Sequence, residues 1–304
     1  MHIKGFAWTQ PLSQLGLGGL VCLMLTMGAA TRAGAQEIEP YEFTPLPAGT
    51  NLAIGYYIYQ HATEFNVARG NTIKNSGYQV NFGDARYVHF VDVGGHPAGF
   101  QIIEPFGSVS AAHIDGLRLG STFGAQNLQL SAFIWPYVNT VTKTNVNLTG
   151  FVYPPTGTYN RQALINLGDN RWSGDVQVGL TQGIGDNLGI DVSFDTQFYG
   201  NNGDYFPGNR RLSQDPTLRA QVWANWRWSP AFSTSLGYEG LFGGNQKVNG
   251  FLDGNKTEEQ RIRANAALFL SPRVQTMIEL NHDVKVVGGF KQDFGTTFRI
   301  LYAF

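Results

Sequence analysis

The sequence predicts an all-β protein that forms a single antiparallel up-and-down transmembrane β-barrel. About twelve strands are expected, with long extracellular loops and short periplasmic turns. Three observations favour this fold class. Apolar and polar residues alternate with a period of two along most of the chain, aromatic residues make up 13% of it, and the connections between the expected strands are alternately long and short.

The last stretch, residues 289–304, shows the alternation most clearly. One parity carries the apolar residues Phe290, Phe294, Phe298, Ile300, Tyr302 and Phe304. The other parity carries Lys291, Asp293 and Arg299. A period of two indicates a strand, and aromatic residues near both of its ends are typical of a barrel strand that crosses a bilayer. The terminal Phe304 resembles the end of bacterial outer-membrane proteins, so we expect the outer-membrane assembly machinery to recognise this strand.

The composition is compatible with one large all-β domain. The chain has 304 residues, of which 14% are charged, and the formal net charge is −1. Its mean hydropathy is slightly negative, which is too polar for a bundle of membrane helices but suits a barrel, because half of each barrel strand faces a polar lumen. The near-neutral charge argues against a nucleic-acid partner.

Residues 1–35 are predicted to be a secretory signal peptide. Lys4 provides a positive start, residues 15–27 form an apolar run too short for a comfortable membrane span, and Ala33-Gly34-Ala35 fits a cleavage site. The single cysteine, Cys22, lies within this segment, so the mature chain would have no disulfide. Residues 36–49 contain three prolines and no periodicity, and we expect a periplasmic N-terminal lead-in there, followed by the barrel over 50–304.

Twelve strands are expected in the barrel, with a bulge near 84–86 where the parity slips. Their approximate ranges are 50–60, 78–92, 98–106, 127–137, 146–153, 171–182, 188–199, 217–228, 231–242, 258–270, 273–286 and 289–304. Connections are mostly long after odd strands and short after even ones, as in barrels of the Gram-negative outer membrane. A secreted β-sandwich is the rival fold, but it has no reason to alternate its loops.

Three parts of the chain resemble a known family. These are 41–65 (YEFTPLPAGTNLAIGYYIYQHATEF), 86–106 (RYVHFVDVGGHPAGFQIIEPF), and Pro155-Thr156-Gly157 followed by 166–173 (NLGDNRWS). They resemble the outer-membrane barrels named for a "putative meta-pathway of phenol degradation", and the resemblance covers essentially the mature chain. It implies a channel associated with the uptake of aromatic compounds. These motifs lie at turns and strand starts, so no catalytic or binding residue is carried over from the family.

No arrangement of residues indicates catalysis, a metal or a cofactor. The histidines lie in turns, loops or at strand ends without a serine or carboxylate at a motif spacing, and the glycine pairs read as turns. We therefore expect a protein that is not an enzyme and has no cofactor. Outer-membrane lipid and a small-molecule solute are the expected partners.

The lumen wall is predicted from strand parity, which also places Val222 and Trp226 toward lipid. The candidate lumen residues are Asp191, Asp195, Arg219, Trp223, Arg227, Glu239, Arg261, Arg263, Glu279, Asp283, Asp293 and Arg299. Their signs alternate from strand to strand, which allows cross-strand pairs such as Arg261 with Asp283. These charges could fill and stiffen the interior or line a path for solute, and Trp223 could stack an aromatic solute or only fill space.

The first functional hypothesis is an outer-membrane channel for small aromatic or hydrophobic molecules. The second is a barrel that transports nothing and binds a ligand with its extracellular loops. The third is a barrel hydrolase. A loop folded into the lumen would favour the channel over the loop-binding barrel.

Overall fold

The computed structural model describes residues 37–67, 71–206, 208–252, 256 and 258–304. The expected signal peptide and Gln36 lie outside the described residues. Within that described part of the chain, no helix is long and apolar enough to cross a membrane.

Twelve antiparallel strands close into a barrel, as the sequence predicts. They are β1 (Asn51–Asn66), β3 (Gly77–Val93), β4 (His96–Ile114), β6 (Gln129–Asn139), β7 (Thr144–Tyr153), β8 (Ser173–Ile184), β9 (Leu188–Tyr199), β12 (Thr217–Arg227), β13 (Phe232–Gly243), β16 (Glu258–Ser271), β17 (Val274–Val287) and β18 (Gly289–Ala303). The barrel closes where β18 pairs with β1, from Leu52 opposite Ala303 to Asn66 opposite Gly289. Closure leaves no unpaired sheet edge, which a bilayer requires.

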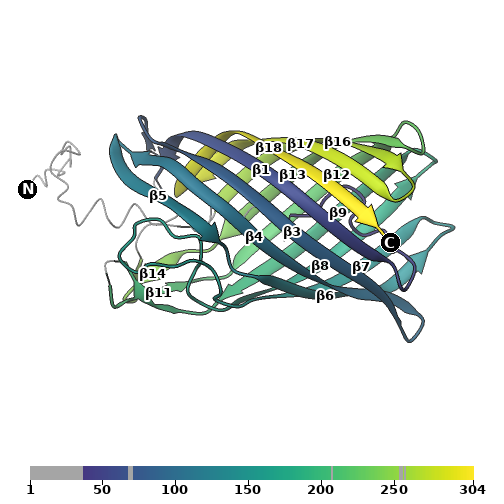
Figure 1. Cartoon of the computed structure of the whole chain (residues 1–304), viewed down its shortest axis with the longest axis horizontal. Helices are drawn as coiled ribbons and strands as arrows, with labels where there is room; N and C mark the ends of the chain where they lie inside the picture. Colours follow the sequence, from purple (N-terminus) through teal and green to yellow (C-terminus); the bar gives the residue numbers. More distant parts are fainter. Residues whose placement is uncertain (1–36, 68–70, 207, 253–255, 257) are drawn as a thin grey trace, which may run out of the picture.

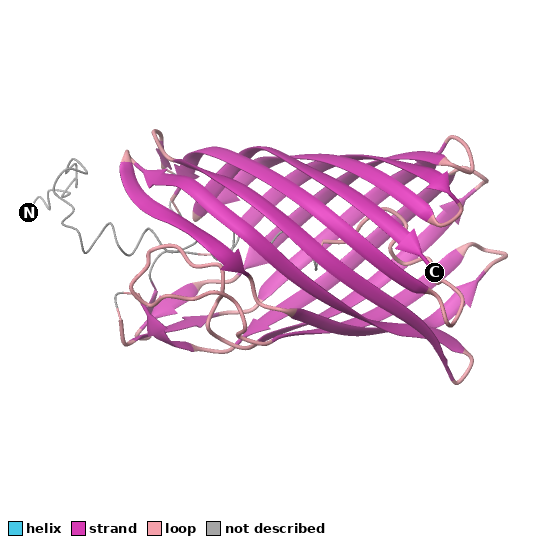
Figure 2. Cartoon of the chain, viewed as in Figure 1, coloured by secondary structure: helices cyan, strands magenta, loops and turns pink. Residues whose placement is uncertain are grey.

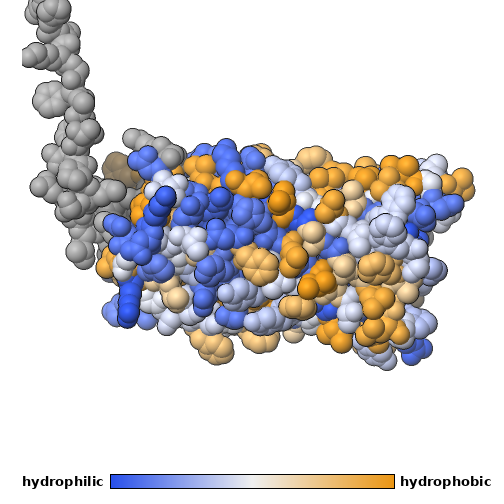
Figure 3. Space-filling model, turned by 90° about the horizontal axis from the view of Figure 1, so that it is seen from above, coloured by the Kyte–Doolittle hydropathy of each residue, from blue (hydrophilic) through white to orange (hydrophobic). Residues whose placement is uncertain are grey.

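The two faces of β12 differ as parity predicts. In β12, Val222 and Trp226 are 37% and 41% exposed, whereas Gln221 and Asn225 are 2% and 0% exposed. Outward side chains are mostly apolar because they would meet lipid, and inward ones bond to each other. Figure 3 shows hydrophobic residues gathered over the half of the barrel on the right of the view and hydrophilic ones over the left-hand half.

The long connections gather at the end opposite the C-terminus (Figures 1 and 2). Several contain strands that the sequence analysis missed: β2 (Thr72–Ile73), β5 (Leu117–Ala125), β10 (Asn202–Tyr205), β11 (Arg210–Gln214), β14 (Gln246–Val248) and β15 (Phe251–Leu252). β5 extends the hairpin that β4 begins, where a polar loop was expected. The last four form a separate sheet in the order β10-β11-β14-β15.

The expected bulge near residues 84–86 was wrong. β3 pairs without interruption through this region on both sides, since its inward face is apolar on either side of Asp84 and Arg86. The parity changes instead where β18 pairs with β1. His61 lies opposite Phe294 and Ala62 opposite Gln292, so Asp293 is an extra residue in β18, and Thr63 is in turn an extra residue in β1.

Residues 37–46, ahead of β1, lie inside the barrel rather than projecting from it, and the exposed residues 47–49 connect them to β1. They contain turns and no strand, with backbone hydrogen bonds from Glu42 N to Glu39 O (3.1 Å) and from Thr44 N to Tyr41 O (3.1 Å). The side chains of Ile38 and Phe43 are each only 2% exposed. We call residues 37–46 the plug, because they occupy the lumen.

Candidate functional site

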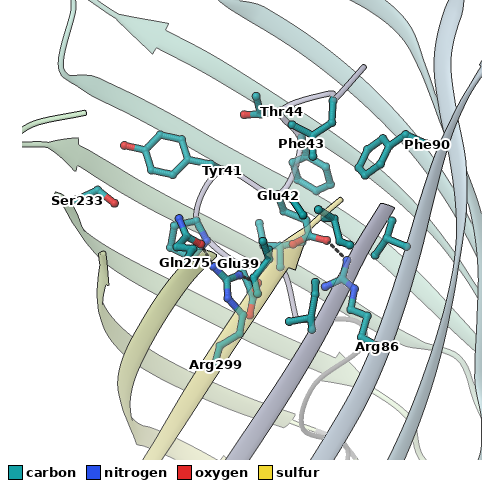
Figure 4. A pocket seen from close by; sticks show the side chains of 18 of the residues that line it. Glu39, Tyr41, Glu42, Phe43, Thr44, Arg86, Phe90, Ser233, Gln275 and Arg299 are labelled. Carbon is teal, nitrogen blue, oxygen red and sulfur yellow. Dashed lines mark hydrogen bonds and ion pairs between the residues drawn. The ribbon is translucent and has the colours of Figure 1, made fainter. Parts of the chain in front are cut away.

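Carboxylates of the plug face arginines of the lumen wall. Glu37 Oε1 lies 3.0 Å from Arg261 Nη1, and Glu37 Oε2 lies 3.4 Å from Arg263 Nη2. Glu39 pairs with Arg299 of β18. Glu42 pairs with Arg86 of β3, as the dashed line in Figure 4 marks. The plug is thus attached to the wall by charge on three sides.

The polar backbone of the plug is also bonded to the wall. Gln221 Oε1 accepts a hydrogen bond from Ile38 N (3.0 Å), and Asp191 Oδ2 accepts one from Tyr41 N (2.7 Å). Trp135 Nε1 donates to Phe43 O (2.9 Å). Unpaired backbone groups inside a protein are costly, so these hydrogen bonds fix the position of the plug in the lumen.

Trp223 is one of the wall residues that contact the plug. Its side chain is 1% exposed and clusters with Ile38 and Phe43, and the Arg263 guanidinium carbon lies 4.7 Å from the centre of its ring. An incoming solute therefore cannot stack on Trp223 while the plug is docked. Of the two sequence-based readings, the structure favours the one in which this indole fills the lumen.

The opposed charges of neighbouring strands contact each other across the lumen wall. Arg261 lies opposite Asp283, with Nε 2.8 Å from Oδ1, in the register expected from the turn at Pro272. Arg263 Nε lies 2.8 Å from Glu279 Oε1, and Arg219 Nε lies 3.3 Å from Glu239 Oε1.

The remaining candidates lie in three environments. Asp191 and Asp195 are buried in the lumen, and Asp195 accepts a hydrogen bond from Gln177 (3.3 Å). Arg227 is exposed at the periplasmic end of β12, with its guanidinium carbon 5.5 Å from the centre of the Tyr41 ring. Asp293 was expected in the lumen, but it is the extra residue at a bulge in β18, and it accepts a hydrogen bond from Thr63 in an exposed position.

The same bulge reverses the parity of the residues next to Asp293. Phe290 is 3% exposed and packs inside the barrel instead of facing lipid. Lys291, expected on the charged lumen face, lies 3.6 Å from Glu64 with a partly exposed side chain.

The arginines around the plug set the ionisation of its first acid. Burial alone would raise the pKa of Glu37, but the positive charges of Arg263, Arg261 and Arg219 outweigh burial and hold the pKa below its ordinary value of 4.5. Glu37 is therefore ionised at neutral pH and binds the wall as an anion.

A cavity of 480 Å³ surrounds the periplasmic part of the plug. One wall is apolar and comes from β18, β1, β3 and β6: Leu52, Ile54, Val88, Phe90, Phe133, Trp135 and Leu301. Three of its rings touch, with centroids 5.6 Å apart for Phe90 and Phe133, 5.3 Å for Phe133 and Trp135, and 6.0 Å for Phe90 and Trp135. Polar groups such as Gln101 and Gln177 line another side. Figure 4 shows Phe43 of the plug directed toward Phe90.

The sequence analysis did not predict this apolar wall. It also did not predict that Glu37, Glu39 and Glu42 of the plug would face arginines of the lumen wall. The signal was present in β3, where Tyr78, Val80, Phe82, Val88 and Phe90 share one parity. An apolar face was assumed to meet lipid, but here it meets the lumen. The outward face of the same strand, with Gly83 and Ala85, is less apolar than its inward face.

Among the described residues, no group of three or more His, Cys, Asp or Glu side chains is arranged to hold a metal ion. The histidines bond locally: His89 Nδ1 lies 2.8 Å from Asn51 Oδ1, and His113 Nδ1 lies 2.7 Å from the carbonyl oxygen of Ala111.

Three comparisons relate the chain to known proteins. The sequence model of the family described as "Putative MetA-pathway of phenol degradation" matches residues 62–300. The comparison with curated proteins gave no match. Among solved structures, the COG4313 outer membrane channel from Pseudomonas putida F1 is 27% identical with a TM-score of 0.84, over 88% of this chain and 100% of that chain. A deletion mutant of the monoaromatic hydrocarbon channel TodX is 7% identical with a TM-score of 0.50, over 87% and 92% of the two chains, so it supports the fold alone. The barrel fold and the outer-membrane location that the sequence predicts are confirmed.

Proposed function

Since the chain belongs to the family described as "Putative MetA-pathway of phenol degradation", we propose that it is an outer-membrane channel for small hydrophobic molecules, neutral aromatic ones among them. The observation that carries this proposal is the cavity of 480 Å³ with its wall of aliphatic and aromatic side chains. Ligand cavities of this size, largely apolar with a few polar groups, hold small organic molecules.

The distribution of charge in the lumen supports an uncharged solute. The buried arginines of β12, β16 and β18 are paired with wall or plug carboxylates. Separating such a pair in a lumen of low polarity is costly, so an ion gains little by competing for one partner. An apolar solute that packs against the aliphatic and aromatic side chains of the cavity does not compete for these pairs.

The plug must loosen or leave space for passage. Its side chains Phe43 and Leu46 line the same cavity as Phe90 and Trp135. A solute that packs against these rings replaces apolar contacts of the plug with its own, which lowers the cost of displacing it.

Uptake by cells that contain the protein tests the proposal. Cells with and without it are compared for uptake of toluene and of arabinose, a small polar solute. We expect the protein to accelerate uptake of toluene much more than uptake of arabinose. Equal acceleration of both would indicate a general diffusion pore, and acceleration of neither would favour the barrel that only binds a ligand with its loops.

One observation favours that second candidate. The sheet β10-β11-β14-β15 gives part of the extracellular loops a folded core of Tyr205, Leu212 and Val248. Deleting this sheet separates the two functions, since a channel through the barrel would keep its toluene uptake and a loop receptor would lose its ligand.

The third hypothesis, a hydrolase, lacks such support. The COG4313 protein is described as a channel, and we propose that this chain likewise has no enzymatic activity.

A further inference from the structure

The connection between β7 and β8 contains a compact loop whose two ends touch. A Cβ added to Gly157 would lie 2.6 Å from the Cα of Gly168, and one added to Gly168 would lie 2.5 Å from the carbonyl carbon of Gly157. Gly168 N also donates a hydrogen bond to Thr158 O (2.9 Å). Residues 157–168 therefore form an Ω-loop, a compact type of surface loop that is often functional.

The tip of this loop is bonded to itself. Asn166 Oδ1 accepts a hydrogen bond from Asn160 N (2.6 Å), and Asn166 Nδ2 donates to Asn160 O (3.1 Å) and to Ala163 O (3.3 Å). These bonds hold the tip as a unit that can keep its shape when it moves.

The neck of the loop is bonded to the wall. Thr158 N donates to Ala125 O of β5 (2.9 Å), and Gly157 N donates to Asn127 Oδ1 (3.1 Å). The neck is thus the fixed end about which the tip would turn.

Two apolar side chains of the tip enter the barrel. Ile165 and Leu167 are 3% and 5% exposed, and they belong to a buried cluster at the end of the lumen away from the short turns. The wall contributes the other members of that cluster: Ile58, Ala62, Phe65, Tyr78, Val80, Phe82, Val109, Ala112, Ile114, Leu119 and Phe290. On the same tip, Arg161 and Gln162 are exposed to solvent. The tip therefore has a polar outer side and an apolar inner side, as a lid over an apolar site requires.

We propose that this Ω-loop is the extracellular lid of the barrel, and that the apolar cluster beneath it is an entry site for an uncharged apolar solute. In the closed state, Ile165 and Leu167 occupy the places that a ring or alkyl group of the solute takes when the lid turns outward. The wall of the site is aliphatic and aromatic and is already formed, because its strands are part of the barrel. This inference rests on the proposed channel function and adds where the solute enters.

Cysteine labelling from outside tests the lid. The one native cysteine lies in the expected signal peptide, so a mature chain with Leu167→Cys would carry a single thiol. A water-soluble maleimide should label this thiol roughly tenfold or more slowly than the thiol of Gln162→Cys, which is exposed on the same loop, because Ile165 stays buried in this variant and one buried side chain of that size favours closure by about that factor or more. Addition of toluene should accelerate labelling of Leu167→Cys and leave that of Gln162→Cys unchanged. The lid proposal would be contradicted if, without toluene, the thiol of Leu167→Cys reacted as fast as the thiol of Gln162→Cys. It would also be contradicted if toluene did not change the labelling rate of Leu167→Cys.

A parallel uptake measurement separates this inference from the channel function. If toluene accelerates labelling of Leu167→Cys but does not enter liposomes through the protein, the entry site is supported and the proposed channel function is contradicted. If toluene enters while labelling of Leu167→Cys stays slow, the channel function stands and the lid is wrong. Ile165→Ala should raise toluene entry several-fold, because it removes apolar contact that keeps the lid closed.

Discussion

A hydrogen bond of 2.9 Å joins the indole Nε1 of Trp223 to the carbonyl oxygen of Ile38. It connects the middle of β12 to a residue 185 positions earlier in the chain. The ring also covers Gly237 of β13, where an added Cβ would lie 2.6 Å from it. The wall, the indole and the plug are therefore packed as one unit, and Trp223 is one of the wall side chains that hold the plug in place.

Trp223→Ala should loosen the plug and raise the ionic conductance of the channel. It removes the hydrogen bond to Ile38 and leaves a buried cavity, which costs about 3–5 kcal/mol of folding free energy for a tryptophan. Trp223→Phe should have a smaller effect because the ring remains while the N–H donor is lost. Single-channel recording in a planar bilayer measures the conductance, with the outward-facing Trp226→Ala as the control. Conductance that stays at the wild-type value in Trp223→Ala would show that the plug is held without this residue.

Gly179→Ala should also loosen the plug, by a steric route. A Cβ at this position of β8 would lie 2.3 Å from the ring of Phe43, so the methyl group and the plug cannot keep their places together. The matched control is Gly150→Ala on β7, where an added Cβ would meet no atom within 4 Å. We expect protease sensitivity of the plug and conductance to rise in Gly179→Ala alone. If protease sensitivity and conductance rose in both variants, the cause would be a change in the barrel strands rather than a clash with Phe43.

Acid should weaken docking of the plug through Glu37. The pKa of Glu37 in the docked state lies below its ordinary value of 4.5, so docking favours the ionised carboxylate. Its contribution is complete above pH 4.5 and is lost as the pH falls through the lowered pKa. Conductance should therefore rise when the pH is lowered from 5 toward 3. Glu37→Gln should show weaker docking at pH 7 and a smaller change over this range, and an identical pH profile in both proteins would exclude Glu37 as the cause.

The strands could be predicted from the sequence because a lipid-facing pattern is local. In β9 and β12 every second residue must be apolar, and the expected range 188–199 agrees with Leu188–Tyr199. The position of the plug could not be predicted, because it depends on pairs such as Glu37 with Arg261, which are 224 residues apart. The environment of Asp293 was mispredicted for a related reason. Asp293 is the extra residue where the pairing of β18 with β1 shifts, and the alternation along β18 alone does not show that shift.

The orientation of β12 and β8 predicts different costs for one new charge on the lipid side and on the lumen side of the barrel. Val222→Arg puts a guanidinium against lipid and should cost about 2–4 kcal/mol near the bilayer midplane. The comparison is Gln177→Arg on β8, a lumen position that lines the cavity and lies 3.3 Å from Asp195, so a new cation there meets an existing carboxylate. Urea unfolding in liposomes measures both. The assignment of faces would fail if Gln177→Arg proved the more costly change.

The pair of Arg261 and Asp283 separates a structural role of the lumen charges from a role in passage. Arg261 contacts Asp283 within the wall and Glu37 of the plug, whereas Asp283 accepts its second hydrogen bond from the backbone N of Gln292 (2.8 Å). Arg261→Ala leaves the buried Asp283 without its arginine partner, which is expected to cost about 3–5 kcal/mol, whereas Asp283→Ala leaves Arg261 paired with Glu37 and Glu259. Arg261→Ala, Asp283→Ala and the double variant form a cycle whose coupling energy measures the pair.

Stability and toluene flux should respond differently in this cycle. We expect Arg261→Ala to lose more stability than Asp283→Ala, because Arg261 also pairs with Glu37 and Glu259, and we expect the double variant to lose less than the sum of the two. Flux should change in Arg261→Ala, which removes one of the two arginine partners of Glu37, and stay near the wild-type value in Asp283→Ala, which leaves the contact between Arg261 and Glu37 in place. Additive stabilities would show that the pair does not interact. Equal changes of flux in both single variants would mean that Arg261 and Asp283 themselves line the path of the solute. The contact between Arg261 and Glu37 would then not control the flux.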